Sequence, residues 1–302
     1  MYSAFEFGRS ALLQGMRLSL PQRHIDFPRR PLLMGIVNVN DDSFSGDGTL
    51  DFGEALAQAK AQIEAGADII DVGAESARTN REAIPVGEEL RRFTGFLEGW
   101  QGVIESAKPR DNEQLWPPML SANTWRPEVI EQLLPMGGIE LLNDMSALPD
   151  GRNASACAKH GVALLIMHSV GEPKVAHTHQ QWKNVMASIK TFFEEKIAMA
   201  KAAGLDDTRM VLDPGIEFAK QCDDNLTVYR ELGQLQDFGL PVLVPVSRKT
   251  VIGEVLGIKE PKDRDAGTLA CIAASMERGA QMFRVHNVDA AWQAVKVLHL
   301  AY

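Results

Sequence analysis

A single (β/α)₈ barrel is the fold class that the sequence predicts, and three observations support it. Short apolar runs alternate with helical patterns eight times within about 270 residues, the usual size of such a barrel. The runs are apolar throughout, as is typical of buried parallel strands. A last helical pattern reaches the C-terminus. An open doubly wound sheet would give the same alternation, but the count of eight favours closure.

The strands are expected where apolar residues cluster between turn signals. The first run follows Pro31, and the residues before it are expected to form a short N-terminal extension, 1–30, to a barrel domain of 31–302. No linker or low-complexity tract divides the chain. The eight predicted strands are 32–37, 67–72, 118–120, 139–142, 162–167, 210–212, 241–246 and 281–285.

The helices are expected between these runs. The clearest is the fifth, in which apolar residues recur at three- and four-residue steps from Trp182 to Ile197, and Gly204 is suited to cap its end. The segment after the seventh strand reads as helical through Arg278. The other predicted helices are 52–65, 87–106, 127–134, 154–160, 226–235 and 290–298.

Composition excludes several classes of protein. With 45% hydrophobic and 24% charged residues the chain reads as globular, and its net charge of −9 argues against binding nucleic acid or an anionic membrane. No apolar stretch is long enough to cross a membrane, and the N-terminus has no secretory pattern. Three cysteines without paired spacing suggest a reducing compartment, so we expect a cytoplasmic protein. His177 and His179 are interpreted as loop residues.

Polar side chains follow every predicted strand, and in a barrel they would meet at one mouth. Two kinds of chemistry can be read from them. Several cations suggest a bound phosphate or diphosphate, although pairing with acids on the rim is the competing interpretation. An amide–carboxylate set suits the edge of an amino-oxo-pyrimidine ring, although the carboxylate could instead cap the turn that follows it. The cations are Arg78, Arg248, Lys249, Arg284 and His286, and the second set is Asn123, Asn143 and Asp213.

In the motifs at its predicted strands, the chain resembles the dihydropteroate synthases of the pterin-binding barrel superfamily. The similarity runs in order from about residue 33 to residue 300, and each fragment lies at a predicted strand. The fragments are MGIVNVNDDSFS (34–45), ADIIDVGAESAR (67–78), SANT (121–124), LLNDMSAL (141–148), LIMHSVGEP (165–173), LDPGIEFAK (212–220), PVSRKTVIG (245–253) and RVHNV (284–288).

The resemblance implies a transferase of folate biosynthesis. It would join 6-hydroxymethyl-7,8-dihydropterin diphosphate to 4-aminobenzoate and release diphosphate, with Mg²⁺ as cofactor and assembly as a homodimer. Sulfonamides mimic 4-aminobenzoate, and because the amine pocket is altered we expect this chain to bind them differently from ordinary members of the family. Lys249, Asp213 and Arg78 would be catalytic. Asn123, Asn143, Asp213 and Lys249 would bind the pterin. Asn38 would hold magnesium and, with Arg78, Arg284 and His286, the diphosphate, while Phe44, Phe218, Ser247 and Arg248 would surround the aminobenzoate.

The sequence departs from the motifs of the dihydropteroate synthases at several positions. Asn123 stands where the family has an aspartate that touches the pterin. Glu217 and Ala219 replace two glycines, and Asn287 replaces an aspartate. Two loops also differ, at 40–41 and at 77–80. These departures place the expected differences in the rim and in the amine pocket.

Three alternatives stay open from the sequence. The first is the same reaction with another arylamine, such as a ribosylated aminobenzene. The second is a pterin-binding methyltransferase, which the basic groups after the seventh and eighth strands disfavour because a methyl donor carries no diphosphate. The third is an inactive pterin-binding paralogue, motivated by Asn123.

Overall fold

The computed structural model describes residues 15–41, 48–76, 82–171, 173–175 and 180–301. Eight parallel strands form one sheet in the order β8-β7-β6-β5-β4-β3-β10-β9. The Leu212–Val242 bridge and the bond from the Leu212 N–H to the Pro241 carbonyl (2.8 Å) join its two edges. The predicted (β/α)₈ barrel is therefore confirmed. The strands are β3 (Leu32–Asn38), β4 (Ile69–Gly73), β5 (Met119–Asn123), β6 (Leu141–Asp144), β7 (Ala163–Met167), β8 (Met210–Asp213), β9 (Leu243–Val244) and β10 (Met282–Val285).

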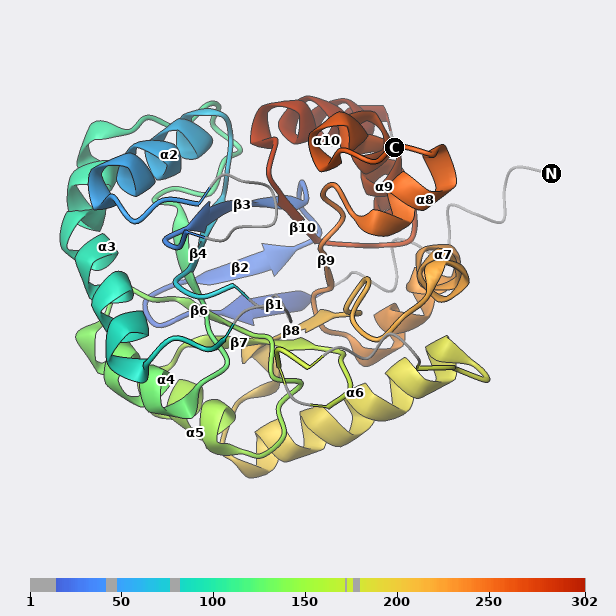
Figure 1. Ribbon diagram of the computed structural model, residues 1–302, viewed down its shortest axis with the longest axis horizontal. Helices are drawn as coiled ribbons and strands as arrows, with labels where there is room; N and C mark the ends of the chain where they lie inside the picture. The colour runs from blue at the N-terminus through green and yellow to red at the C-terminus, as the bar shows by residue number, and fades with distance from the viewer. Residues whose placement is uncertain (1–14, 42–47, 77–81, 172, 176–179, 302) are drawn as a thin grey trace.

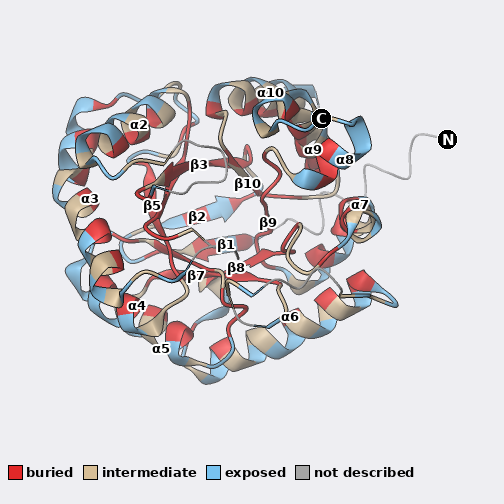
Figure 2. Ribbon diagram, viewed as in Figure 1, coloured by how far each residue is buried: buried red, intermediate tan, exposed pale blue. Residues whose placement is uncertain are grey.

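The helices form a ring around the barrel (Figure 1). Their inner faces are buried and their outer faces are exposed (Figure 2), as amphipathic helices around a buried sheet require. They are α2 (Phe52–Glu64), α3 (Val86–Ser106), α4 (Pro127–Leu133), α5 (Arg152–His160), α6 (Val185–Ala202), α7 (Cys222–Glu231), α8 (Thr250–Leu256), α9 (Asp265–Glu277) and α10 (Val288–Ala301), with 3₁₀ turns η1 (Leu134–Met136), η2 (Asp207–Arg209), η3 (Leu232–Phe238) and η4 (Pro261–Arg264).

Two of the predicted helices were wrong in detail. The fifth starts at Val185 and not at Trp182, because the Asn184 side chain accepts the Ala187 N–H and caps the helix there. The Trp182 indole instead donates to the Ala219 carbonyl at 2.7 Å. The segment predicted as helical through Arg278 is split into α8, η4 and α9, with Gly257 ending α8 in a left-handed conformation.

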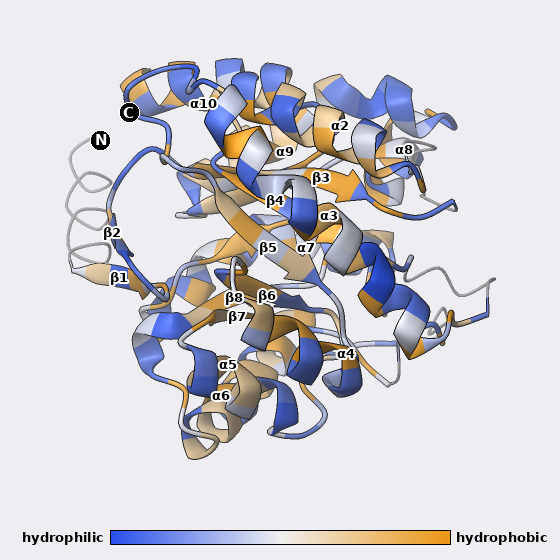
Figure 3. Cartoon of the chain, turned by 90° about the vertical axis from the view of Figure 1, so that its left-hand side faces the viewer, coloured by the Kyte–Doolittle hydropathy of each residue, from blue (hydrophilic) through white to orange (hydrophobic). Residues whose placement is uncertain are grey.

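Part of the predicted N-terminal extension closes one end of the barrel. Strands β1 (Met16–Ser19) and β2 (His24–Phe27) form an antiparallel hairpin. Its buried side chains, including Leu18 and Ile25, pack against the first inward-facing residues of the barrel strands. Arg23 also forms a two-point ion pair with Glu140, just before β6. Figure 3 shows the hairpin at the side of the molecule near the N-terminus, where the strands begin. The opposite mouth is left for a site.

Candidate active site

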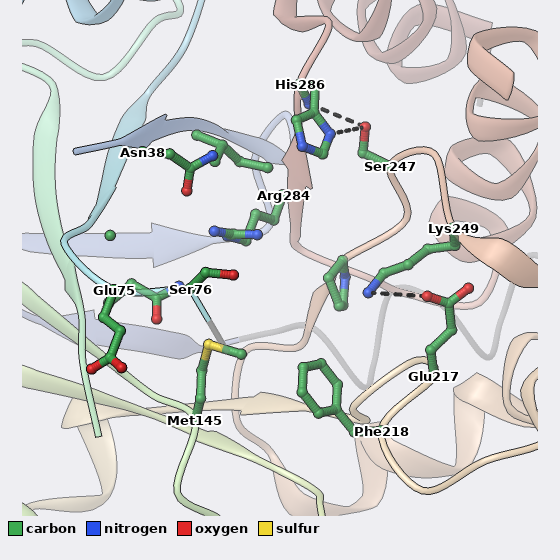
Figure 4. A pocket seen from close by; sticks show the side chains of 14 residues that line it. Asn38, Glu75, Ser76, Met145, Glu217, Phe218, Ser247, Lys249, Arg284 and His286 are labelled. Atoms are coloured by element: carbon green, nitrogen blue, oxygen red, sulfur yellow. Dashed lines mark hydrogen bonds and ion pairs between the residues drawn. The ribbon is translucent and has the colours of Figure 1, made fainter. Parts of the chain in front are cut away.

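A pocket of about 290 Å³ lies at the carboxyl ends of the strands (Figure 4). A barrel carries its chemistry at this end, because the loops that follow the strands converge there. The lining residues come from seven of the eight barrel strands or from the loops that follow them. They are Ile36, Asn38, Gly73, Glu75, Ser76, Asn123, Met145, Glu217, Phe218, Pro245, Ser247, Lys249, Arg284 and His286.

Asp71 is fully buried beneath the pocket floor and bonds to two residues that line it, Asn123 and Arg284. Its Oδ1 accepts the Ser121 hydroxyl at 2.6 Å. Its Oδ2 accepts the amide nitrogens of Asn123 (3.2 Å) and Asn143 (3.0 Å) and the Nε of Arg284 (2.8 Å). A buried carboxylate with four donors, one of them a guanidinium, is well stabilised, and it fixes the direction of each donor in return.

The strand register puts the two amides in one row. Asn123 of β5 lies opposite Gly73 of β4 and opposite Asn143 of β6, and Gly73 in turn lies opposite Asn38 of β3. Gly73 lines the pocket between these amides, and a Cβ there would lie in ordinary van der Waals contact with the Asn38 Oδ1, at 3.6 Å. Since the Nδ2 atoms of Asn123 and Asn143 are used by Asp71, the carbonyl oxygens of the two amides are left as acceptors.

Asp213 ends β8 and is also buried. Its Oδ1 accepts the Gly215 N–H at 2.7 Å, so the turn-capping role considered from the sequence is real for that oxygen. Its Oδ2 accepts no hydrogen bond from the described residues. Burial raises the pKa of Asp213 to about 6, while the Gly215 hydrogen bond and Lys249, Lys220 and Arg284 act in the opposite direction. At neutral pH the carboxylate is ionised and can accept N–H donors.

The loop after Asp213 is held by a buried lysine. The Lys220 ammonium lies 2.8 Å from the His168 Nδ1 and donates to the carbonyls of Gly215 (2.9 Å) and Phe218 (3.1 Å). Burial lowers the pKa of Lys220 to about 7, and burial together with Lys220 lowers the pKa of His168 to about 2. The loop therefore has little freedom, and Phe218 is fixed against the pocket.

Three of the five predicted cations are paired with acids, as the competing interpretation proposed. Arg284 is bound to Asp71, and Arg248 makes a two-point ion pair with Asp265 (2.8 and 3.1 Å). Lys249 lies 3.9 Å from Glu217. Pairing does not remove Arg284 from ligand binding, because only its Nε is used by Asp71 and the residue still lines the pocket.

His286 and Ser247 lie together on the β9–β10 side. The His286 Nδ1 and its backbone N–H both contact the Ser247 hydroxyl, at 2.9 and 3.1 Å. The Ser247 hydroxyl therefore orients the imidazole of a residue predicted to bind the diphosphate.

Glu75, which lies two residues after the end of β4, connects three loops of the mouth. Its side chain is 3% exposed and pairs with Arg126 of the loop after β5 and with Lys174 of the loop after β7 (3.0 Å). Lys174 also donates to the Ser76 carbonyl at 2.9 Å. This cluster stabilises the rim opposite Lys249.

The structure brings most of the predicted site residues together. Seven line the pocket: Asn38, Asn123, Phe218, Ser247, Lys249, Arg284 and His286. Asn143 and Asp213 are buried at the adjoining strand ends, each 4% exposed. Arg248 does not line the pocket and is directed to Asp265. Phe44 and Arg78 lie outside the described residues.

Sequence reasoning missed Asp71 altogether. The signal was present, because Asp71 is a charged residue inside an apolar run and is followed two residues later by a glycine that also faces inward. Asp71 lies within the predicted run 67–72, whereas the polar residues assigned to the site lie at the ends of the runs or after them. Glu217 was noticed as a departure but was given no position in the site.

Comparisons with known proteins agree with this geometry. The sequence model described as "Pterin binding enzyme" matches residues 34–286. The dihydropteroate synthase of Escherichia coli (strain K12) is 34% identical over 286 residues, 94% of each chain. Among solved structures, Yersinia pestis dihydropteroate synthase in a sulfonamide drug complex has a TM-score of 0.83 at 31% identity and covers 95% of this chain and 98% of that one.

The dihydropteroate synthase of Thermus thermophilus in complex with 4-aminobenzoate has a TM-score of 0.78 at 34% identity, covering 95% of this chain and all of that one. These matches confirm the resemblance and the transferase class that the sequence predicted. A pocket with a carboxylate–amide floor and a basic wall, at the mouth of a barrel that matches these enzymes over nearly its whole length, identifies the chain as a member of the dihydropteroate synthase family of pterin-binding enzymes.

Proposed function

We propose that this protein transfers the pterinylmethyl group of 6-hydroxymethyl-7,8-dihydropterin diphosphate to the nitrogen of an aromatic amine and releases diphosphate, a step of folate biosynthesis. The 4-aminobenzoate bound by the Thermus relative is the first amine to test. The observation that carries the proposal is the floor, where Asp71 orients two amides and one guanidinium around a pocket that also has a basic wall.

The pterin is assigned to the side of Asp213 and Asn143. An aminopyrimidinone edge presents N–H donors, and the Asp213 Oδ2 and the carbonyl oxygens of Asn143 and Asn123 are acceptors. The amide at 123 also avoids a second carboxylate beside Asp71, because its Nδ2 lies 3.2 Å from the Asp71 Oδ2. Asn123 therefore keeps an acceptor for the pterin without the charge of the family aspartate.

The diphosphate is assigned to Arg284, His286 and Asn38. The two terminal nitrogens of Arg284 donate to no described residue, and its side chain is 22% exposed in the pocket. As the C–O bond of the substrate breaks, negative charge grows on the diphosphate oxygens. A guanidinium already fixed by Asp71 stabilises that charge without having to reorganise.

The amine is assigned to the wall of Phe218 and Lys249. The Lys249 ammonium lies 5.6 Å from the centre of the Phe218 ring, which is a cation–π distance, and its side chain reaches the Ile216 carbonyl (3.2 Å). Lys249 thus lies between the pterin side and the aromatic wall. We assign it to position both substrates.

A magnesium ion suits the same site when the diphosphate supplies most of its ligands. Asn38 lines the pocket with an amide oxygen, and the described ranges contain no cluster of three or more His, Cys, Asp or Glu side chains that could hold a metal. Mg²⁺ favours one or two protein groups together with substrate phosphates. We propose Asn38 as that protein ligand, and the bound ion would neutralise charge on the leaving group.

The test is diphosphate release from purified protein with the dihydropterin diphosphate and 4-aminobenzoate. Turnover with an aromatic amine supports the proposal. Tight pterin binding without turnover on any amine would instead support the inactive paralogue. In that case Asn123→Asp, which restores the family carboxylate, should raise activity.

We further propose a cytoplasmic homodimer. No helix in the described part of the chain is long and apolar enough to span a membrane. Four exposed large apolar side chains lie on two helices of the same side of the barrel, Val255 and Leu256 on α8 and Val297 and Leu300 on α10. Light scattering after gel filtration tests the dimer, and aspartate at positions 297 and 300 should weaken it if this surface is involved.

A further inference from the structure

Glu217 holds an uncommon backbone conformation beside the pocket. Its φ is +73° and that of Ala219 is +53°, in the left-handed region that favours glycine. The segment is kept there by the Glu217 N–H bond to the Asn225 Oδ1 (2.8 Å) and by the Trp182 bond to the Ala219 carbonyl. Strain retained at the edge of a site suggests that the side chain is needed there.

The Glu217 carboxylate is a fixed negative charge in the pocket wall. Its Oε1 accepts the Val251 N–H at 2.9 Å, and its Oε2 lies 3.9 Å from the Lys249 Nζ. The side chain is 25% exposed and lines the pocket. Figure 4 shows Glu217 and Lys249 directed toward one another, with the Phe218 ring nearby. The carboxylate is thus held by one backbone hydrogen bond and one ion pair from the next barrel unit.

This contact changes the charge of the aromatic wall. Lys249 is the basic residue beside Phe218, and Glu217 offsets its charge. Arg248 is engaged by Asp265 and does not line the pocket. An arylamine bound against Phe218 therefore meets a paired lysine and a fixed carboxylate among the described residues. A negatively charged ring substituent gains no attraction from the neutralised Lys249 and lies against the Glu217 carboxylate, whereas a neutral hydrogen-bond donor can bond to Glu217.

We propose that Glu217 determines amine specificity: it selects against carboxylated arylamines and favours neutral ones whose ring substituent donates a hydrogen bond, such as a hydroxyl. This inference rests on the proposed pterinylmethyl transfer and names the class of its second substrate. Leaving Lys249 without its carboxylate partner at the edge of the pocket is expected to strengthen binding of an anionic ring substituent about 10-fold after screening by salt.

The experiment compares 4-aminobenzoate with its neutral counterpart 4-aminobenzyl alcohol. Binding of each amine is measured by calorimetry on protein loaded with a dihydropterin and diphosphate, so that no turnover is required. The wild type is compared with Glu217→Gln, which keeps the acceptor for the Val251 N–H and removes the charge. Glu254→Gln is the control, because Glu254 is exposed on α8 and lies outside the pocket.

We expect Glu217→Gln to shift the ratio of the two dissociation constants about 10-fold toward 4-aminobenzoate, and Glu254→Gln to leave the ratio unchanged. Comparing the ratio between variants cancels the intrinsic difference between the two amines. An unchanged ratio in Glu217→Gln, or an equal shift in Glu254→Gln, overturns the inference. Diphosphate release is measured in parallel. Its absence with both amines would reject the proposed function, while the binding ratio would still decide the part played by Glu217.

Discussion

Replacing Asp71 by asparagine tests whether one buried carboxylate organises the pocket floor. The amide has the same shape, and its oxygen can accept the three donors that now bond to Oδ2. Its NH₂ then faces the Ser121 hydroxyl, which can rotate to accept. What the variant loses is the charge opposite Arg284.

The size of the effect follows from that ion pair. Breaking a buried pair costs about 3–5 kcal/mol. The Arg284 side chain is 22% exposed and can be partly solvated, so we expect a loss of unfolding free energy of about 2–3 kcal/mol. Arg284 would also lose its fixed direction, and a displacement of about 1 Å at a reacting group costs roughly 100-fold in rate. We expect kcat/KM for diphosphate release to fall by about that factor.

Urea unfolding and diphosphate-release kinetics measure the two effects. The matched control is Ser121→Ala, which removes one donor to Asp71 and leaves the ion pair intact, at an expected loss of about 1 kcal/mol and with little change in kcat/KM. Wild-type stability together with wild-type turnover in Asp71→Asn would refute the view that Asp71 holds the floor.

Three further predictions concern other parts of the molecule. Asp213→Asn should have a higher free energy of unfolding than the wild type at pH 7, by up to about 3 kcal/mol, as measured by urea unfolding. Because the pKa of Asp213 is raised, the folded wild type retains a proton between about pH 4 and 6 and loses stability as the pH rises through that window. The difference in unfolding free energy between the variant and the wild type should therefore vanish near pH 4. A difference that stays constant with pH would contradict this prediction. Leu18→Ala should lower the unfolding free energy by about 2–5 kcal/mol without changing kcat/KM, because Leu18 is buried at the end of the barrel opposite the pocket. The control Arg17→Ala, on the exposed face of the hairpin, should change the unfolding free energy by less than about 1 kcal/mol. Reduced activity of Leu18→Ala at a temperature where it is folded would contradict the prediction. Gly215→Ala should fail to fold or melt far below the wild type, since its Cβ would lie 1.9 Å from the His168 carbonyl oxygen. Gly239 has a similar φ, but a Cβ there would have no atom within 4 Å, so Gly239→Ala should lose only about 1 kcal/mol of unfolding free energy. Similar melting temperatures for the two variants would show that the loop at Gly215 can move.

The barrel and most of the pocket could be predicted from the sequence, because both depend on local patterns. Apolar runs define strands, and the residue after each run lies at the mouth whenever the strands are parallel. Asn38 and Asp213, which directly follow their predicted strands, could be placed by this argument alone. The hairpin of 16–27 could not, since its short alternation is weak and its stability comes from contacts with the barrel strands.

By itself, then, the sequence determined the eight strand–helix units and the polar residues that end the strands, because both are periodic and local. The tertiary structure alone decided which groups bond to which. Asp71 and Arg284 are 213 residues apart in the chain, and Glu217 meets the Val251 N–H 34 residues away. Such pairs depend on closure of the barrel and on strand register, and no periodicity within one segment records them. The physical reason is that burial and closure set the direction of a side chain, and with it the charge that a ligand meets.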